Sequence, residues 1–370
     1  MDVVAELTDS VATCRARAAD DPAHLPDLAM ALAHLGIAYH QRGLQADAVE
    51  QVEQASATWR RVVANNSGHR LDLAGTLSDL GTLYGLLGRH ADALGPSEEA
   101  VALCRALAAE DPMYTPNLAG ALTNLGGRYS AVGQRDDAVA TAEEAVALYR
   151  YLAEHEPALL PHLATALAGL GVEYSEVGRH ADAMGPSEEA VRLRRTLAAE
   201  NPDHLPDLAA ALTNLGGRCH STGRFADALA NAEEAVSIYR PLAERNPGHL
   251  GNLGTALTNL GNAYGVVGRG AEAVVLNREA AEVFRPLAAG NPGHLPDLAM
   301  ALNNLGLQLG QTGRHAEAVG PLEEAVTIYR PLAAGNPAYQ RNLSLALANL
   351  SRSQQSGDVR PAKKRFWQRG

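Results

Sequence analysis

Apolar residues recur along the chain at helical spacing, and the whole pattern returns every 45 residues. Leu212, Leu215 and Cys219 stand at i, i+3 and i+7, which places them on one face of an α-helix. A second helix is predicted from the letters RFADAL through EEAVSIYRPLA to the Asn246-Pro247 break. No stretch alternates Val, Ile and Thr as a strand would, so we predict an all-α chain.

A Leu-Gly pair marks the repeat. It stands at 35–36, 80–81, 125–126, 170–171, 215–216, 260–261 and 305–306, and Leu350-Ser351 is an imperfect eighth copy. No insertion or deletion disturbs this register over more than 300 residues. Such regularity is typical of stacked repeats that share one continuous core.

Each unit is predicted to be a pair of antiparallel helices. Pro206 suits the first turn of the first helix, and Gly223 suits its end. Residues 1–21 align with a second helix alone, 22–337 with seven full repeats, 338–356 with a first helix alone, and 357–370 with a basic tail that we expect to be disordered.

Composition and charge disfavour several classes of protein. A net charge of −11 disfavours a general nucleic-acid binder. Three cysteines, far apart in sequence, favour a reduced cytoplasmic protein. The N-terminus lacks the pattern of a signal peptide, and no apolar run reaches the ~20 residues that span a bilayer. We therefore expect a cytoplasmic protein with no membrane span.

One repeat carries a complete family pattern. Leu-x2-Leu-Gly-x2-Tyr is followed by Ala twelve residues after the Gly and by another Ala seven later, at Leu122, Leu125, Gly126, Tyr129, Ala138 and Ala145. The pattern resembles the tetratricopeptide repeat, in the long form found in kinesin light chain and its bacterial relatives. The resemblance implies a right-handed α-solenoid of antiparallel helix pairs. It covers about residues 1–356.

An asparagine recurs opposite the core stripe of the first helix. On a helical wheel at ~100° per residue, Asn124 lies nearly opposite Leu122 and Leu125, among small neighbours. Its carboxamide both donates and accepts hydrogen bonds, as a peptide backbone requires. By resemblance to tetratricopeptide superhelices, the ladder that holds an extended peptide would be Asn124, Asn214, Asn259, Asn304 and Asn349, with Asn262 on the same face and Asn303 and Arg352 adding specificity.

The ladder is broken at His34, Asp79 and Gly169, so residues 214–349 form the preferred site. A structural role remains an alternative, because the same amides would also bond between repeats and set the stacking angle. A peptide held only through its backbone should bind weakly, since each hydrogen bond contributes about 1 kcal/mol net.

Residues that suggest chemistry have simpler explanations. Most of the thirteen histidines fall in two columns of the repeat, and copies in different repeats lie ~10 Å or more apart, too far to share a metal ion. Adjacent Glu-Glu pairs indicate a solvated face, and no phosphate-loop, hydrolase or zinc-protease motif occurs. We predict no enzyme, no metal and no cofactor.

The sequence thus predicts a non-catalytic scaffold that binds an extended peptide or partner segment in its concave groove. One alternative is a sensing module of a larger signalling ATPase or protease. Another is self-assembly of copies of this chain through the half repeats at its ends. The expected partner is a protein or peptide, not nucleic acid.

Overall fold

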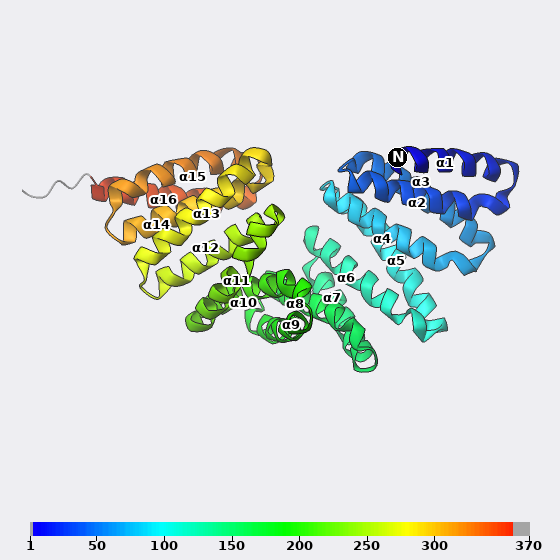
Figure 1. The fold of residues 1–370 in the computed structure, drawn as a ribbon, viewed down its shortest axis with the longest axis horizontal. Helices are drawn as coiled ribbons and strands as arrows, with labels where there is room; N and C mark the ends of the chain where they lie inside the picture. Colours follow the sequence, from blue (N-terminus) through cyan, green and yellow to red (C-terminus); the bar gives the residue numbers. More distant parts are fainter. Residues whose placement is uncertain (1–2, 358–370) are drawn as a thin grey trace, which may run out of the picture. The chain divides into compact units, whose positions relative to one another are not determined.

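The computed structural model describes residues 3–357, and helices account for nearly all of that range (Figure 1). The first helices of the repeats are α2 (Leu25–Gln41), α4 (Arg70–Leu86), α6 (Thr115–Ala131), α8 (Leu160–Glu176), α10 (Leu205–Ser221), α12 (Leu250–Val266), α14 (Leu295–Gln311) and α16 (Gln340–Gly357). The second helices are α1 (Val3–Asp20), α3 (Gln45–Asn65), α5 (His90–Glu110), α7 (Arg135–His155), α9 (His180–Glu200), α11 (Phe225–Arg245), α13 (Gly270–Gly290) and α15 (His315–Gly335). The prediction of an all-α fold with a 45-residue period is confirmed. Apart from Gly357, the predicted basic tail lies outside the described residues.

The helices group into two compact units, Met1–Ala190 and Val191–Gly370, and the boundary falls inside α9. Inside a unit, a first helix packs against its own second helix and against the second helix that precedes it; α12, for example, packs against α13 and α11. Adjacent first helices, such as α10 and α12 or α14 and α16, also touch. Neighbouring first helices therefore lie side by side within each unit.

Local signals start and stop the helices. Before α10, the side-chain oxygen of Asn201 accepts a hydrogen bond of 3.0 Å from the backbone N–H of Asp203, which caps the short 3-10 turn η5 (Pro202–His204). After α10, Gly223 has φ 77°, a left-handed conformation that costs glycine no steric strain. The chain then reverses into α11. These features recur in most repeats, so the same capping side chains and glycines set the helix boundaries along the chain.

The core lies between the two helices of each pair. Leu212 is fully buried, and its equivalents Leu32, Leu77, Leu122, Leu167, Leu257 and Leu302 are at most 2% exposed. Gly261 lets α13 approach closely, because a Cβ built there would lie 2.6 Å from Nδ2 of Asn277. Burial of each leucine contributes about 1.5–3 kcal/mol, so stability accumulates repeat by repeat.

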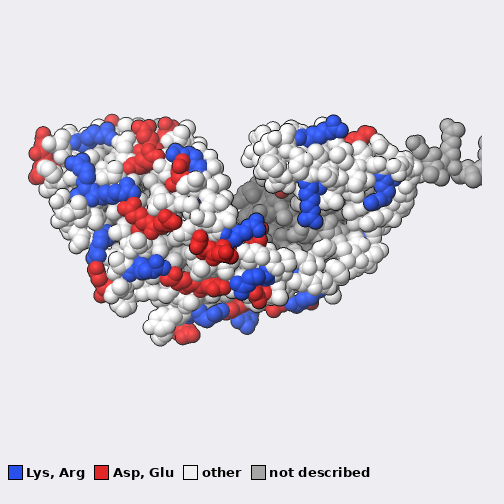
Figure 2. All heavy atoms as spheres, turned by 180° about the vertical axis from the view of Figure 1, so that it is seen from behind, with Lys and Arg blue, Asp and Glu red and all other residues white. Residues whose placement is uncertain are grey.

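The Glu-Glu pairs do more than solvate the outer surface. The second glutamate of a pair accepts hydrogen bonds from an arginine 39 residues earlier, on the preceding second helix, as Glu144 does from Arg105 at 2.9 Å. The same pairing joins Arg60 to Glu99, Arg150 to Glu189, Arg195 to Glu234 and Arg285 to Glu324. In Figure 2, bands of acidic and basic side chains lie side by side over the first unit. Each exposed pair contributes little alone, and the series repeats the same contact between neighbouring second helices.

Candidate functional site

The predicted site residues all lie on first helices, but not in one unit. Asn124 is exposed on α6 of the first unit, and the other seven lie in the second unit. There Asn214 and Arg352 are exposed, and Asn259, Asn262, Asn303, Asn304 and Asn349 are half-buried. The candidate site is therefore best defined within the second unit.

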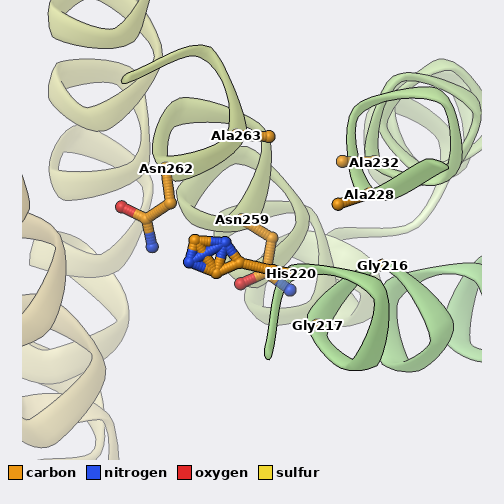
Figure 3. A pocket seen from close by; sticks show the side chains of 8 residues that line it. All are labelled: Gly216, Gly217, His220, Ala228, Ala232, Asn259, Asn262 and Ala263. Atoms are coloured by element: carbon orange, nitrogen blue, oxygen red, sulfur yellow. The ribbon is translucent and has the colours of Figure 1, made fainter. Parts of the chain in front are cut away.

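A cavity of about 70 Å³ opens between α10 and α12, beside α11 (Figure 3). Its lining consists of Gly216, Gly217, His220, Ala228, Ala232, Asn259, Asn262 and Ala263. The polar side chains of Asn259, Asn262 and His220 lie together on one side, and small residues of α11 lie across the opening. Two of the predicted asparagines therefore border the same hollow.

His220 was not among the predicted residues. Its ring meets that of Phe225, the first residue of α11, edge-on at a centroid distance of 5.6 Å. This packing holds the imidazole beside the cavity. The repeat column of His220 holds only one other histidine, His40, which is a weak sequence signal and explains why the pattern did not reveal it.

A second cavity, of about 100 Å³, lies between α14, α15 and α16. It occupies the same place in the repeat, because Gly306 and Asn349 stand 90 residues after Gly216 and Asn259. Its lining consists of Gly306, Leu307, Gly310, Gln311, His315, Asn349, Arg352 and Ser353. The predicted residues Asn349 and Arg352 come together here.

Asn349 also bonds to two other predicted residues, Asn303 on α14, which lies outside the cavity lining, and Arg352 on α16. Asn349 donates from Nδ2 to Oδ1 of Asn303 at 3.0 Å, and Arg352 donates from Nη1 to Oδ1 of Asn349 at 3.5 Å. The Asn303–Asn349 bond fits the structural alternative, a bond between adjacent repeats. Asn214 and Asn304 line neither cavity.

A column of long polar side chains fills the equivalent space elsewhere. Arg128 extends over Gly85 and donates to the hydroxyl of Thr82 at 3.2 Å, and its burial lowers the pKa of the guanidinium. Gln308 extends over Gly265 in the same way and is 5% exposed. Each of these side chains closes the gap between adjacent first helices. This column can be recognised in the sequence, because its members directly precede the Tyr or Leu that ends the apolar stripe of the first helix.

The first unit holds a related cavity of about 100 Å³ between α6 and α8, lined in part by Gly126, Gly127, Gly169 and Glu173. Gly169 takes the place that Asn259 has in the second unit, so this cavity has no carboxamide at that position. Glu173 is 8% exposed, and burial raises the pKa of its carboxyl group. The polar character of the cavities thus differs between repeats.

The chemistry of these cavities is hydrogen bonding. Amides, imidazoles and one guanidinium surround the two cavities of the second unit. Across residues 3–357, no three His, Cys, Asp or Glu side chains are placed to hold a metal ion together. None of the described helices combines the length and apolar character needed to span a membrane.

Comparison with protein families decides the classification. Tetratricopeptide repeat models match residues 252–330 and, as five further segments, residues 28–69, 73–112, 118–152, 163–205 and 208–246. The chain belongs to the tetratricopeptide repeat family. Tetratricopeptide repeats generally mediate protein–protein interaction and are generally non-catalytic. No curated protein matches the chain.

Solved structures share the tetratricopeptide repeat fold. BtubC (BKLC) from P. vanneervenii is 20% identical with a TM-score of 0.54, and the match covers 66% of this chain and 91% of that one. The STAND protein PH0952 from Pyrococcus horikoshii, which has a tetratricopeptide repeat sensor, is 14% identical with a TM-score of 0.61 over 90% of this chain and 47% of that one. Aspartyl phosphate phosphatase F from Bacillus subtilis is 12% identical with a TM-score of 0.53 over 92% and 73% of the two chains. At these identities the likeness concerns the fold alone.

Proposed function

We propose that this tetratricopeptide repeat protein is a non-catalytic scaffold that binds an extended segment of a partner protein along the first helices of its second unit. The observation that carries the proposal is the pair of equivalent cavities, one bordered by Asn259 and Asn262 and the other by Asn349 and Arg352. Each cavity offers room for a side chain, with hydrogen-bonding groups beside it for the peptide backbone.

The spacing suits an extended chain. Packed helices lie about 8–10 Å apart, so cavities two repeats apart are separated by roughly 20 Å. An extended peptide advances about 3.3 Å per residue, so about six residues would join the two cavities. Asn303 and Asn304 lie on α14 between them. A segment of eight to ten residues, as an approximate length from the same rise, would reach both cavities.

Side-chain anchoring matters because backbone bonds alone give little affinity. Each net hydrogen bond contributes about 1 kcal/mol, whereas micromolar binding requires about 8 kcal/mol. The cavities supply buried contact that a flat asparagine face would lack. Filling a cavity should therefore weaken binding as strongly as removing the amides beside it.

The test selects peptides of twelve residues from a random displayed library against the 370-residue chain and measures their dissociation constants. The combined substitution Asn259→Ala, Asn262→Ala and Asn304→Ala should weaken the selected peptides at least about tenfold. Ala263→Gln should do the same by extending a side chain into the first cavity, because Gln308, at the equivalent position of the next repeat, fills the corresponding space over Gly265.

The matched control is Glu173→Gln, which places the same side chain at the equivalent position of the first unit's cavity. It should leave binding to the second unit intact. Selected peptides that bind both second-unit variants with unchanged affinity would contradict the proposal.

A sensing module of a larger protein is a second candidate. The likeness to the STAND protein supports it only at the level of fold, since the match covers 47% of that chain. The same face would then bind a segment of the larger polypeptide. Binding assays with the separate chain would detect that segment as a peptide ligand, so the experiment above serves both candidates.

A steric clash disfavours self-assembly through the half repeats at the two ends. Leu347, whose equivalents are at most 2% exposed, is 40% exposed on α16. If α1 of a second copy docked against α16 as a second helix docks against its own first helix, Leu7 would lie against Ser351. These two residues would take the places that Leu322 and Gly306 have in the preceding repeat. At Gly306 the leucine leaves no room for a Cβ. We therefore expect a clash and favour the peptide-binding function.

A further inference from the structure

We propose that the cavity between α14, α15 and α16 binds a carboxylate group. The inference rests on the proposed function only in assigning that carboxylate to the partner segment. The recognition itself follows from the side chains that surround the cavity. They differ in charge from those around the cavity of Figure 3, which serves as an internal comparison.

The shape of the cavity follows from one shortened side chain. At Gly85 and Gly265, the space above the glycine is filled by the residue 43 positions later, Arg128 and Gln308. At Gly310, the corresponding residue is Ser353. A Cβ built on Gly310 would lie 3.4 Å from Ser353 Oγ, and the shorter side chain leaves about 100 Å³ open. The open space corresponds to that of a guanidinium or carboxamide, so a planar group of that size fits.

The lining is rich in donors. Arg352 is exposed and, among the described residues, donates only a long bond of 3.5 Å to Asn349. Nδ1 of His315 is buried, lies 3.9 Å from a Cβ built on Gly310, and has no hydrogen-bond partner among the described residues. Ser353 is 3% exposed and supplies a hydroxyl group. A carboxylate has the acceptors that these groups lack.

The charge around the cavity favours an anion. α12 and α16 contain no Asp or Glu, and the single acidic residue of α14, Asp297, faces His294 at 3.4 Å in its first turn. Glu317, in the first turn of α15, is paired with Arg314 at 2.6 Å. His315 begins α15, and the positive end of a helix dipole also favours an anion. A carboxylate is thus preferred over the neutral carboxamide of the same shape.

The cavity in Figure 3 lacks this character. His220 takes the place of Gly310, Phe225 that of His315, and Asn262 that of Arg352. Its lining contains no Lys or Arg. The two cavities would therefore anchor chemically different side chains of one segment.

The test uses three small probes and the ring signals of His315 in NMR spectra of the 370-residue chain with labelled histidine. N-acetyl-glutamate N-methylamide presents a side-chain carboxylate, N-acetylalanine presents a terminal one, and N-acetyl-glutamine N-methylamide is the neutral isostere. The His315 signals, assigned with His315→Gln, should shift saturably with at least one carboxylate. The probe that binds more tightly identifies the source, an acidic side chain or a chain terminus.

Two variants locate the site. Ser353→Gln reproduces the arrangement of Gln308 over Gly265 and should fill the cavity, and Arg352→Gln removes an exposed cation without changing the packing. Either change should weaken the carboxylate about tenfold or more. The matched control, Gln308→Ser, opens the equivalent space over Gly265, where Leu307 and Gly270 replace Arg352 and His315. It should leave carboxylate binding as it is in the parent chain.

The proposal is overturned if the glutamine probe binds as tightly as the carboxylates, or if no probe moves the His315 signals. It is also overturned if Arg352→Gln binds them unchanged. Asn259→Ala with Asn262→Ala should not affect the carboxylate probes, because these residues border the other cavity. Failure of the extended peptide to bind is thereby distinguished from failure of this subsite.

Discussion

Two glycine substitutions on neighbouring first helices should have opposite effects on stability. Gly254 on α12 faces Phe284, and a Cβ built on Gly254 would lie 2.7 Å from two atoms of that buried ring. Gly217 on α10 has nothing within 4 Å of such a Cβ. Both changes to alanine remove the same backbone entropy from the unfolded chain, so the difference between them isolates the contact with the ring.

The magnitudes follow from these distances. Gly217→Ala should raise the free energy of unfolding by about 0.5–1 kcal/mol, the usual gain inside a helix. Gly254→Ala has the same gain, but it forces Phe284 to move within a packed core, which costs about 1–3 kcal/mol. We therefore expect Gly254→Ala to be less stable than Gly217→Ala by about 1–3 kcal/mol.

The assay is urea unfolding followed by far-ultraviolet circular dichroism, with hydrogen exchange of α12 as a local measurement. Local exchange is needed because repeat arrays can unfold in parts. Equal stabilisation by the two substitutions would refute the reasoning. It would mean that Phe284 moves without a cost in free energy, and that the close contact at Gly254 does not require a glycine there.

Three further changes test other parts of the fold. Burial raises the pKa of Glu173 above its unfolded value, so its contribution to stability is present in acid and is lost as pH rises through the folded pKa. Glu173→Gln should then be more stable than the parent chain at about pH 7 and gain nothing at about pH 4, as pH-dependent thermal unfolding will reveal. Gly223→Ala should destabilise by about 1–2 kcal/mol, because φ is 77° there, and a normal urea midpoint would contradict this. Arg240→Ala, which breaks the exposed pair with Glu279, should cost less than about 1 kcal/mol, and a larger loss of stability would show that the outer ion pairs act together.

Much of the candidate site could be located from sequence. The helical wheel placed Asn259 and Asn262 on the same face, and the structure puts both at one cavity. It could not reveal that Asn349 bonds to Asn303, because this depends on how closely α14 and α16 approach. Nor could the helical wheel distinguish open gaps between first helices from closed ones, because a gap is closed only where a side chain of the next first helix reaches across it.

The repeating sequence by itself determined the helix pairs, their period, their boundaries and their buried stripes. These properties are local, or follow from one stripe of leucines and a Leu-Gly pair in each repeat. The tertiary structure decided which gaps between first helices stay open. A cavity exists at Gly310 because Ser353 is short, whereas Arg128 and Gln308 fill the same space elsewhere. The physical reason is that the free volume at one glycine is set by a residue 43 positions later, and only packing brings the two together.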